Sequence, residues 1–301
     1  VDLSSNDYLG LALRPGLQTE FFSRTGATSI PMTSSASRLL ASHQEEYHML
    51  EELLSGLYHR PALIFNSGYH ANTGMVSAIA QSAKTLIVAD RLVHASIIDG
   101  MTLSKSPFTR FRHNDLTHLR RILEKEASCY EQVLVIVESV YSMDGDRADI
   151  DGLAEIKRDH PNVLLYVDEA HAFGVEGVHG LGICRSSKCY DDIDIIVGTF
   201  GKACASMGAF CAVSAPLKDY LVNRSRSLIF STALPPMTAA WTRFMIESFL
   251  DMDAEREHLK VLGERLQSIL SPMSPDFPIT ASHIQPLVVG DPKRAVALSA
   301  K

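Results

Sequence analysis

Short apolar runs recur along this chain, separated by segments long enough to form a helix. Each run is too short for an independent helix and is apolar throughout, as is typical of a strand buried on both faces. The segment 116–127 differs, because its leucines recur on one side and its charges on the other, as in a helix. This alternation predicts an α/β fold with a mostly parallel sheet that is covered by helices on both faces. The predicted strands are Ala62–Phe65, Thr85–Ala89, Val133–Val137, Val163–Val167, Ile193–Val197 and Ala209–Val213.

The strand at 209–213 follows the strand before it too closely for a helical crossover. Parallel neighbours need a long connection, whereas antiparallel neighbours can be joined by a short one. We therefore expect one antiparallel neighbour in an otherwise parallel sheet.

The composition is that of a globular protein with a large buried core. Of the 301 residues, 46% are hydrophobic and 21% are charged, which argues against disorder. The formal net charge of -7 disfavours nucleic acid as the main partner, because phosphate binding needs clustered basic surface. The longest apolar runs are far short of the roughly 20 residues that span a bilayer, so no membrane span is predicted.

The cysteines and the start of the chain bear on the compartment. The five cysteines are an odd number and form no CxxC pair, which favours reduced thiols over a disulfide framework or a zinc site. No secretory signal is visible at Val1. We therefore expect a cytoplasmic protein.

Three parts are expected along the chain. Residues 1–30 are predicted to form an N-terminal segment, 31–235 a large domain, and 236–301 a linker helix with the start of a small C-terminal α/β domain. The beginning of the chain is expected to be missing, and the small domain to be truncated.

The last part is expected to be helical first and then mixed. A long helical stretch is predicted from about Pro235 through Leu270. A break rich in Pro and Ser follows at 271–278, and the run at 284–289 is predicted to be a strand.

Two of the predicted strands end on side chains that suit covalent chemistry. Lys202 follows the apolar run at 194–198, and Asp168 and His171 follow the run at 163–167. Ligands of α/β proteins bind at the carboxyl ends of strands. Pyridoxal phosphate chemistry requires a lysine that forms a Schiff base with the cofactor's aldehyde and an aspartate that pairs with its pyridinium nitrogen. The pattern therefore predicts a pyridoxal phosphate site.

Each of these residues also has an ordinary interpretation. Most lysines are exposed, but the small apolar neighbours of Lys202 favour a buried, nucleophilic amine. Asp168 could cap the segment after it, yet an acid that ends an apolar strand is costly to bury without a positive partner. His94 fits two roles equally well, a helix-start residue or a flat ring stacked on the cofactor.

Two further positions suit the phosphate of such a cofactor. Gly68 and Tyr69 follow a strand and open a helix, where free backbone N–H groups bind phosphate, although a plain strand-to-helix turn has the same pattern. Thr199 is either an ordinary strand-end threonine or a hydroxyl donor to the same phosphate.

Nucleotide-binding motifs are the main alternative to a pyridoxal phosphate site. The stretch Asp168-Glu169-Ala170-His171 spells the DEAH box of helicases, but Gly201-Lys202 is followed by Ala203 and forms no Walker A loop, so this interpretation fails. The glycines between 174 and 182 do not match GxGxxG, and a turn is favoured over a phosphate cradle.

Metal and hydrolase motifs are also weak. No HExxH motif is present, and we predict no metal site. Ser142, Asp168 and His171 could be imagined as a hydrolytic triad, but no GxSxG elbow surrounds any serine, so the triad stays a weak alternative.

An ordered set of motifs resembles the α-oxoamine synthases, which are fold-type-I pyridoxal phosphate enzymes. The resemblance covers nearly the whole chain. It implies a mostly parallel seven-stranded sheet with helices on both faces and a smaller α/β C-terminal domain. The motifs are SSNDYLGLA (4–12), NSGYHAN (66–72), HASIIDG (94–100), YSMDGD (141–146), VDEAHAFGVEG (167–177), GTFGKA (198–203) and FSTALPP (230–236).

Three features are most similar to the branch of this family that makes 8-amino-7-oxononanoate. They are FRHND at 111–115, Val93 before HAS, and SHIQPLVVGD at 282–291. This resemblance implies a decarboxylative condensation of L-alanine with a pimeloyl thioester, on coenzyme A or on acyl carrier protein, in biotin biosynthesis.

The resemblance also implies the roles of individual residues. The implied catalytic residues are Lys202, His94, Asp168 and His171. Lys202 is the Schiff-base lysine, Asp168 the pyridinium partner, and His94 the ring stacked on the cofactor and a contact of the substrate. Ser142 and His171 are implied to lie near the cofactor's phenolic oxygen, and Gly68, Tyr69 and Thr199 around its phosphate. Ser231 and Thr232 are implied to reach the phosphate of the partner's cofactor in a homodimer. Asn6 is implied to border the substrate.

The resemblance leaves other activities open. A synthase that uses glycine, serine or another acyl donor would share these motifs, as would glycine C-acetyltransferase, serine palmitoyltransferase or 5-aminolevulinate synthase. The family's carboxylate-binding arginine is expected beyond Lys301. A catalytically inactive dimer partner is an alternative of another class, and the presence of Lys202 argues against it.

Overall fold

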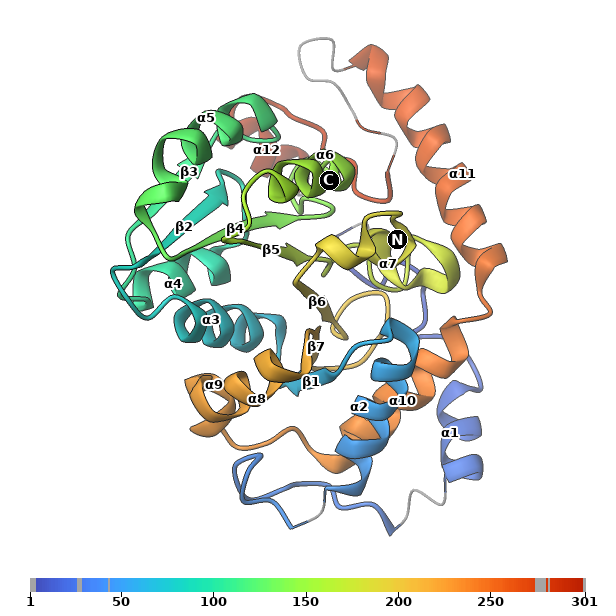
Figure 1. Ribbon diagram of the computed structural model, residues 1–301. Helices are drawn as coiled ribbons and strands as arrows, with labels where there is room; N and C mark the ends of the chain where they lie inside the picture. Colours follow the sequence, from blue (N-terminus) through green and yellow to red (C-terminus); the bar gives the residue numbers. More distant parts are fainter. Residues whose placement is uncertain (1–3, 26–28, 43, 274–279, 281, 300–301) are drawn as a thin grey trace.

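A mostly parallel sheet runs through the centre of the molecule (Figure 1). This computed structural model describes residues 4–25, 29–42, 44–273, 280 and 282–299. Their strands form one seven-stranded sheet with the order β1-β7-β6-β5-β4-β2-β3. The strands are β1 (Ala62–Phe65), β2 (Thr85–Asp90), β3 (Phe108–Phe111), β4 (Gln132–Glu138), β5 (Val163–Asp168), β6 (Ile195–Thr199) and β7 (Ala209–Ala212).

The direction of the strands agrees with the prediction. β7 pairs antiparallel with β1 and β6, whereas the pairs among β2, β3, β4, β5 and β6 are parallel. The predicted α/β fold and its one antiparallel neighbour are confirmed. β3 was not predicted, because its sequence Phe-Thr-Arg-Phe lies at the sheet edge, where only Phe111 is buried and no continuous apolar run is needed.

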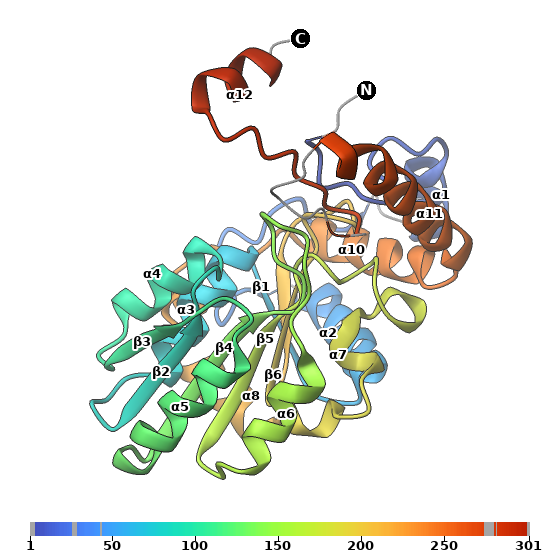
Figure 2. The same ribbon diagram turned by 90° about the horizontal axis from the view of Figure 1, so that it is seen from above.

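Helices cover both faces of the sheet (Figures 1 and 2). The α-helices of the described residues are α1 (Leu17–Thr25), α2 (Glu45–Tyr58), α3 (Gly68–Ile79), α4 (Ala95–Leu103), α5 (Leu116–Glu126), α6 (Ile150–Arg158), α7 (Gly182–Ser186), α8 (Ala215–Arg224), α9 (Arg226–Ile229), α10 (Pro236–Phe249), α11 (Asp253–Leu270) and α12 (Pro292–Ser299), of which α12 does not cover the sheet.

Each face of the sheet has its own apolar core. Along β4, Val133, Val135 and Val137 belong to a core with residues of α2, α5, α6 and α10, whereas Leu134 and Ile136 belong to a core with residues of α3 and α4. Successive side chains of a strand point to opposite faces, and here both faces are buried. The absence of polar alternation in the central strands follows from this arrangement.

The predicted helical stretch from 235 through 270 is two helices. α10 packs against α2 in the core, whereas the buried residues of α11, among those described, are only Arg256 and Gly263. The guanidinium of Arg256 donates hydrogen bonds to the carbonyl oxygens of Phe249 (2.8 Å) and Leu250 (3.0 Å). It thereby satisfies backbone acceptors at the end of α10, where the first helix stops.

The strand predicted at 284–289 is wrong, because these residues are not assigned to any regular element. A strand needs a neighbour for its backbone groups, and the described residues provide none beside this segment. α12 follows and stands away from the sheet with no buried residue (Figure 2). The break predicted at 271–278 lies mostly outside the described residues, and the division at 30 and 235 stays a prediction.

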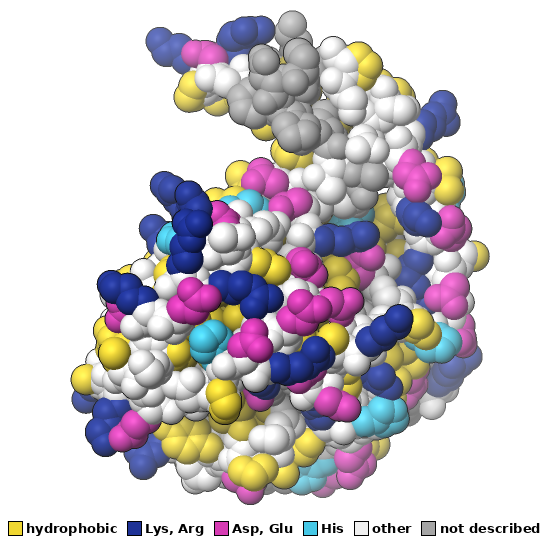
Figure 3. Space-filling view, turned by 45° about the horizontal axis from the view of Figure 1, so that its top comes forward, with side chains coloured by type: hydrophobic (Ala, Val, Ile, Leu, Met, Phe, Trp, Pro, Cys, Tyr) yellow, Lys and Arg dark blue, Asp and Glu magenta, His cyan; other side chains and the backbone are white. Residues whose placement is uncertain are grey.

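The surface carries charges of both signs. On the face shown in Figure 3, Lys and Arg side chains are interspersed with Asp and Glu. Attraction of a polyanion to such a mixed face is weak. Among the described helices none is both long enough and apolar enough to cross a membrane.

The glycines between 174 and 182 form a tight turn, as the spacing suggested. Gly174, Gly177, Gly180 and Gly182 all have positive φ, and the amide of Gly174 donates to the carbonyl of Gly180. At Gly182 a Cβ would lie 2.2 Å from an oxygen of the buried Glu169. Only glycine fits this position, because the backbone of the turn lies directly against the carboxylate of Glu169.

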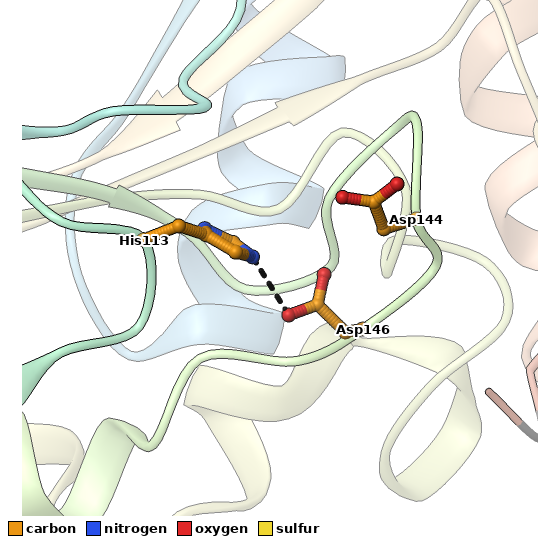
Figure 4. A group of neighbouring side chains, drawn as sticks. All are labelled: His113, Asp144 and Asp146. Atoms are coloured by element: carbon orange, nitrogen blue, oxygen red, sulfur yellow. Dashed lines mark hydrogen bonds and ion pairs between the residues drawn. The ribbon is translucent and has the colours of Figure 1, made fainter. Parts of the chain in front are cut away.

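A hydrogen-bond network ties the end of β2 to the loop that carries Ser142. The Nδ1 of His113 lies 2.9 Å from Asp90, and its Nε2 lies 2.8 Å from Asp146. Asp144 stands beside them (Figure 4), and one ligand atom of each of His113, Asp144 and Asp146 lies within 4.8 Å of the others. Because both nitrogens of His113 already have carboxylate partners, we interpret this group as an ion-pair network that positions the loop.

The network predicts a pH dependence of stability. Burial lowers the pKa of His113, but the hydrogen bonds and charges of Asp90 and Asp146 outweigh burial and raise it above its ordinary value. The stabilisation is therefore fully present below about pH 6.5 and is lost as the pH rises through the higher folded-state pKa. Relative to His113→Gln, the wild type should lose on the order of 1 kcal/mol of unfolding free energy between pH 6 and 9.

Urea unfolding across this pH range measures the difference. His258→Gln, at an exposed position of α11, is the matched control and should keep the wild-type dependence. Parallel pH profiles for the wild type and His113→Gln would contradict the network's role.

Candidate active site

A cavity lined by both buried and exposed residues lies where the parallel strands end. It has a volume of about 170 Å³ and combines acids, an amine, imidazoles and the start of a helix. A larger hollow of about 460 Å³ lies beside α3 and α9, but no described carboxylate or histidine lines it. The lining residues of the smaller cavity are Gly68, Tyr69, Asn72, His94, Ser96, Glu138, Asp168, Ala170, His171, Thr199 and Lys202.

Asp168 is the last residue of β5 and is held from several sides. It is 4% exposed, and its Oδ2 accepts a hydrogen bond of 2.7 Å from the side chain of Asn72 on α3. Its Oδ1 accepts 2.9 Å from the amide of Ala170. Asn72 is fixed in turn by Tyr166 and Ser96. Donors therefore hold the carboxylate rigidly at the floor of the cavity.

Glu138 is a second buried acid that the sequence analysis did not single out. It ends β4 and is paired in register with Asp168 on β5. Burial and the negative charge of Asp168 raise the pKa of Glu138 to about 8, and the amide of His94 donates to its Oε1. The same signal that identified Asp168, an acid at the end of an apolar run, would have found Glu138.

Lys202 lies in the loop between β6 and β7 and lines the cavity. Burial lowers its pKa, while the negative charges of Asp168 and Glu138 act in the opposite direction. The Nζ atom lies 2.7 Å from Nε2 of His171. The amine is thus partly withdrawn from water and placed among acids and an imidazole, not on the surface.

His171 is bonded on both sides of its ring. Besides Lys202 at Nε2, the hydroxyl of Tyr8 lies 2.7 Å from Nδ1. Burial and the positive charge of Lys202 lower the pKa of His171 to about 2. The ring is therefore a neutral imidazole at physiological pH. Tyr8 was not predicted, because it lies 163 residues from His171 in the sequence.

The start of α3 meets the end of β6 at another side of the cavity. Ser67 caps α3, since its hydroxyl accepts a hydrogen bond from the amide of His70. A Cβ on Gly68 would lie 3.7 Å from Oγ1 of Thr199, so the two segments approach closely. The positive end of the helix gives this side the character of an anion site, while the hydroxyl of Thr199 donates a hydrogen bond of 3.1 Å to the carbonyl of Gly208.

His94 is the helix-start residue that one of its two interpretations predicted, and its stacking on a cofactor stays a prediction. Its side chain caps α4 by accepting a hydrogen bond from the amide of Ser96, and its Nδ1 lies 2.7 Å from the hydroxyl of Ser96. The same ring lines the cavity. The cap fixes the ring and leaves a face for a bound group.

Four predicted residues do not line the cavity. Asn6 reaches the lining residue His171 only through Tyr8, whose hydroxyl lies 3.1 Å from Oδ1 of Asn6 and 2.7 Å from Nδ1 of His171. Ser142 follows β4 in the loop that the His113 network holds. Ser231 and Thr232 follow α9, and the carbonyl of Thr232 accepts a hydrogen bond from Asn66. Their predicted roles stay predictions.

The chain has many relatives of known family. The family model "Aminotransferase class I and II" matches residues 1–301. Proteins that carry the provisional name 8-amino-7-oxononanoate synthase include one from Pasteurella multocida, 49% identical over 97% of this chain and 75% of the relative. Another, from Haemophilus influenzae strain KW20 / Rd, is 46% identical over 99% of this chain and 78% of the relative.

Solved structures show the same fold. A serine palmitoyltransferase from S. paucimobilis with bound PLP and myriocin has a TM-score of 0.85 at 27% identity, over 97% of this chain and 75% of that one. An 8-amino-7-oxononanoate synthase from Francisella tularensis has a TM-score of 0.74 at 26% identity, over 95% and 79%. The chain therefore belongs to the aminotransferase class I and II family and, within it, to the α-oxoamine synthases related to 8-amino-7-oxononanoate synthase.

Proposed function

We propose that this enzyme, a pyridoxal phosphate-dependent acyltransferase by family, condenses L-alanine with a pimeloyl thioester to give 8-amino-7-oxononanoate for biotin biosynthesis. The observation that supports this proposal most strongly is that Lys202, Asp168 and His171 line one cavity at the ends of parallel strands. The thioester is carried by coenzyme A or by acyl carrier protein. We infer a cytoplasmic homodimer, in which Ser231 and Thr232 reach the partner's cofactor phosphate.

The donor set of the cavity fits pyridoxal phosphate. The buried carboxylate of Asp168 needs a cation, and a pyridinium nitrogen is one. The helix start at Gly68 and Tyr69, with the hydroxyl of Thr199, suits the phosphate. When bound, pyridoxal phosphate supplies an electron sink for a carbanion next to the amino group.

The remaining contacts follow from the same fit. Lys202 would hold the cofactor's aldehyde carbon covalently through Nζ, and the flat ring of His94 would stack on the pyridine. His171 would donate a hydrogen bond toward the phenolic oxygen, with Ser142 as a second donor. These side chains orient the cofactor and limit its contact with water.

The chain's own groups can move the protons that the reaction needs. Nζ of Lys202 would take the proton from Cα of alanine, which suits an amine whose pKa is lowered by burial. The new bond joins this Cα to the acyl carbon, and the C–S bond breaks to release the thiol. Loss of CO2 then frees a position on Cα, to which a proton returns. His94 can donate a hydrogen bond to the substrate carboxylate or thioester carbonyl, and Asn6 borders the substrate.

The choice of amino acid discriminates this function from its alternatives. Incubation with pyridoxal phosphate, pimeloyl-CoA and L-alanine should release one CO2 per free thiol and form a product with the mass of 8-amino-7-oxononanoate. Thiol release with L-alanine should exceed that with glycine or L-serine by about tenfold or more, since pockets distinguish a single carbon or hydroxyl by that order.

Two other results would change the conclusion. Faster release with serine or glycine would retain the family and replace the substrate, as would preference for another acyl donor. No thiol release with any amino acid, from protein that holds the cofactor at Lys202, would indicate an inactive dimer partner.

Lys202 should carry the covalent link. Borohydride reduction of the loaded enzyme, followed by peptide mass spectrometry, should find the cofactor on Lys202. Lys202→Ala should lose the label and slow turnover by about 10³-fold, because it removes both the anchor and the base. Lys125→Ala, at an exposed position on α5, is the control and should keep the label and the rate. Unchanged turnover in Lys202→Ala would refute the assignment.

A further inference from the structure

A tyrosine of the N-terminal segment contacts the histidine that contacts Lys202. The hydroxyl of Tyr8 lies 2.7 Å from Nδ1 of His171, whose Nε2 lies 2.7 Å from Nζ of Lys202. The same hydroxyl lies 3.1 Å from Oδ1 of Asn6. Four side chains thus form one hydrogen-bonded row from the cavity to the outer segment, in which Tyr8 lies between His171 and Asn6.

The direction of each hydrogen bond in this row depends on which ring nitrogen of His171 carries the proton. Burial keeps this ring neutral, with its pKa at about 2. A neutral imidazole has one N–H and one lone pair. If Nδ1 accepts a hydrogen bond from Tyr8, then Nε2 carries the proton and faces Lys202 as a donor. If Nδ1 donates to Tyr8, then Nε2 faces Lys202 as an acceptor.

Tyr8 has one hydroxyl proton and two acceptors for it. Directed at Asn6, that proton leaves the phenolic oxygen of Tyr8 to accept from Nδ1 of His171. Directed at His171, it makes Nε2 a donor. Burial raises the pKa of Tyr8, so the hydroxyl keeps its proton and can serve either acceptor.

We propose that Tyr8 is a positioning residue, whose hydroxyl orientation sets whether Nε2 of His171 donates or accepts beside Lys202. This inference rests on the proposed function. Beside free Lys202, a protonated amine donates to Nε2 and selects the form in which Nε2 accepts, whereas a neutral amine both donates and accepts and tolerates either form. The anionic phenolic oxygen of bound pyridoxal phosphate requires a donor, so cofactor binding selects the form in which Tyr8 donates to His171.

Packing allows the hydroxyl to be removed without moving the ring. The ring of Tyr8 meets the ring of His283 edge to face, with centroids 4.5 Å apart. Phenylalanine would keep this contact. The titratable groups around His171 are Tyr8, His94, Lys202 and His283, and those facing Lys202 are Asp168 and Glu138.

Tyr8→Phe tests the inference through the absorption of bound cofactor. The pH midpoint of the visible band reports the proton on the link between Lys202 and the cofactor. Without Tyr8, His171 donates less to the phenolic oxygen, whose negative charge then holds that proton more firmly. The midpoint should rise by on the order of half a pH unit.

Two matched variants isolate the cause. Tyr220→Phe removes a hydroxyl that bonds the carbonyl of Ala78 far from the cavity, and should leave the midpoint unchanged. In a His171→Asn background, Tyr8→Phe should have no further effect, because the histidine through which Tyr8 acts is absent. Urea unfolding checks that each variant is folded.

The possible results separate the two proposals. An unchanged or lowered midpoint in Tyr8→Phe, or an equal shift in the His171→Asn background, would overturn the inference and leave the proposed function standing. Failure of wild-type protein to hold the cofactor at Lys202 would overturn both. In cofactor-free protein, the ring ¹⁵N shifts of His171 provide a second test. Tyr8→Phe should change the balance between the two neutral forms, and identical shifts would contradict the inference.

Discussion

Two buried carboxylates stand side by side at the ends of adjacent strands, and the arrangement of the cavity depends on them. Asp168 and Glu138 are paired in register, so the sheet itself fixes their proximity. Ionising both of these buried, adjacent acids costs more free energy than ionising one, because their negative charges repel each other. Three features reduce the repulsion: hydrogen-bond donors contact Asp168, the pKa of Glu138 is raised, and the amine of Lys202 lies nearby. A cation that pairs with Asp168, such as a pyridinium nitrogen, would complete the charge compensation.

The topology explains why distant residues meet. The strands from β2 to β6 run parallel, so their carboxyl ends share one edge. Glu138 and Asp168 are the last residues of β4 and β5, and the segments after β1 and β6 supply the start of α3 and Lys202. Each group is then held by a second residue: Asn72 for Asp168, Ser96 for His94, and Tyr8 for His171. The reactive groups are therefore oriented before any ligand binds.

Local patterns in the sequence predicted the central strands and singled out Asp168 and Lys202 at or after strand ends, but Glu138, which ends β4, was not predicted. Asp168 and Lys202 were predictable because an ionisable residue after an apolar run has few other reasons to be there. Tyr8 was not, since its contact with His171 depends on how a remote segment folds back over the sheet. The edge strand β3 and the unpaired run at 284–289 show the same limit, because strand formation depends on a neighbour that no local pattern reveals.

The pairing of Asp168 with a cationic ring nitrogen is tested most directly by comparing pyridoxal phosphate with its carbocyclic analogue, which lacks that nitrogen. Binding titrations on wild type, Asp168→Asn and the control Glu138→Gln give the affinities. If Asp168 pairs with the ring nitrogen, wild type should bind pyridoxal phosphate about 10- to 100-fold more tightly than the analogue. Glu138→Gln should retain a preference for pyridoxal phosphate, and Asp168→Asn should lose it. An undiminished preference in Asp168→Asn would show that the cavity does not bind the cofactor through this carboxylate.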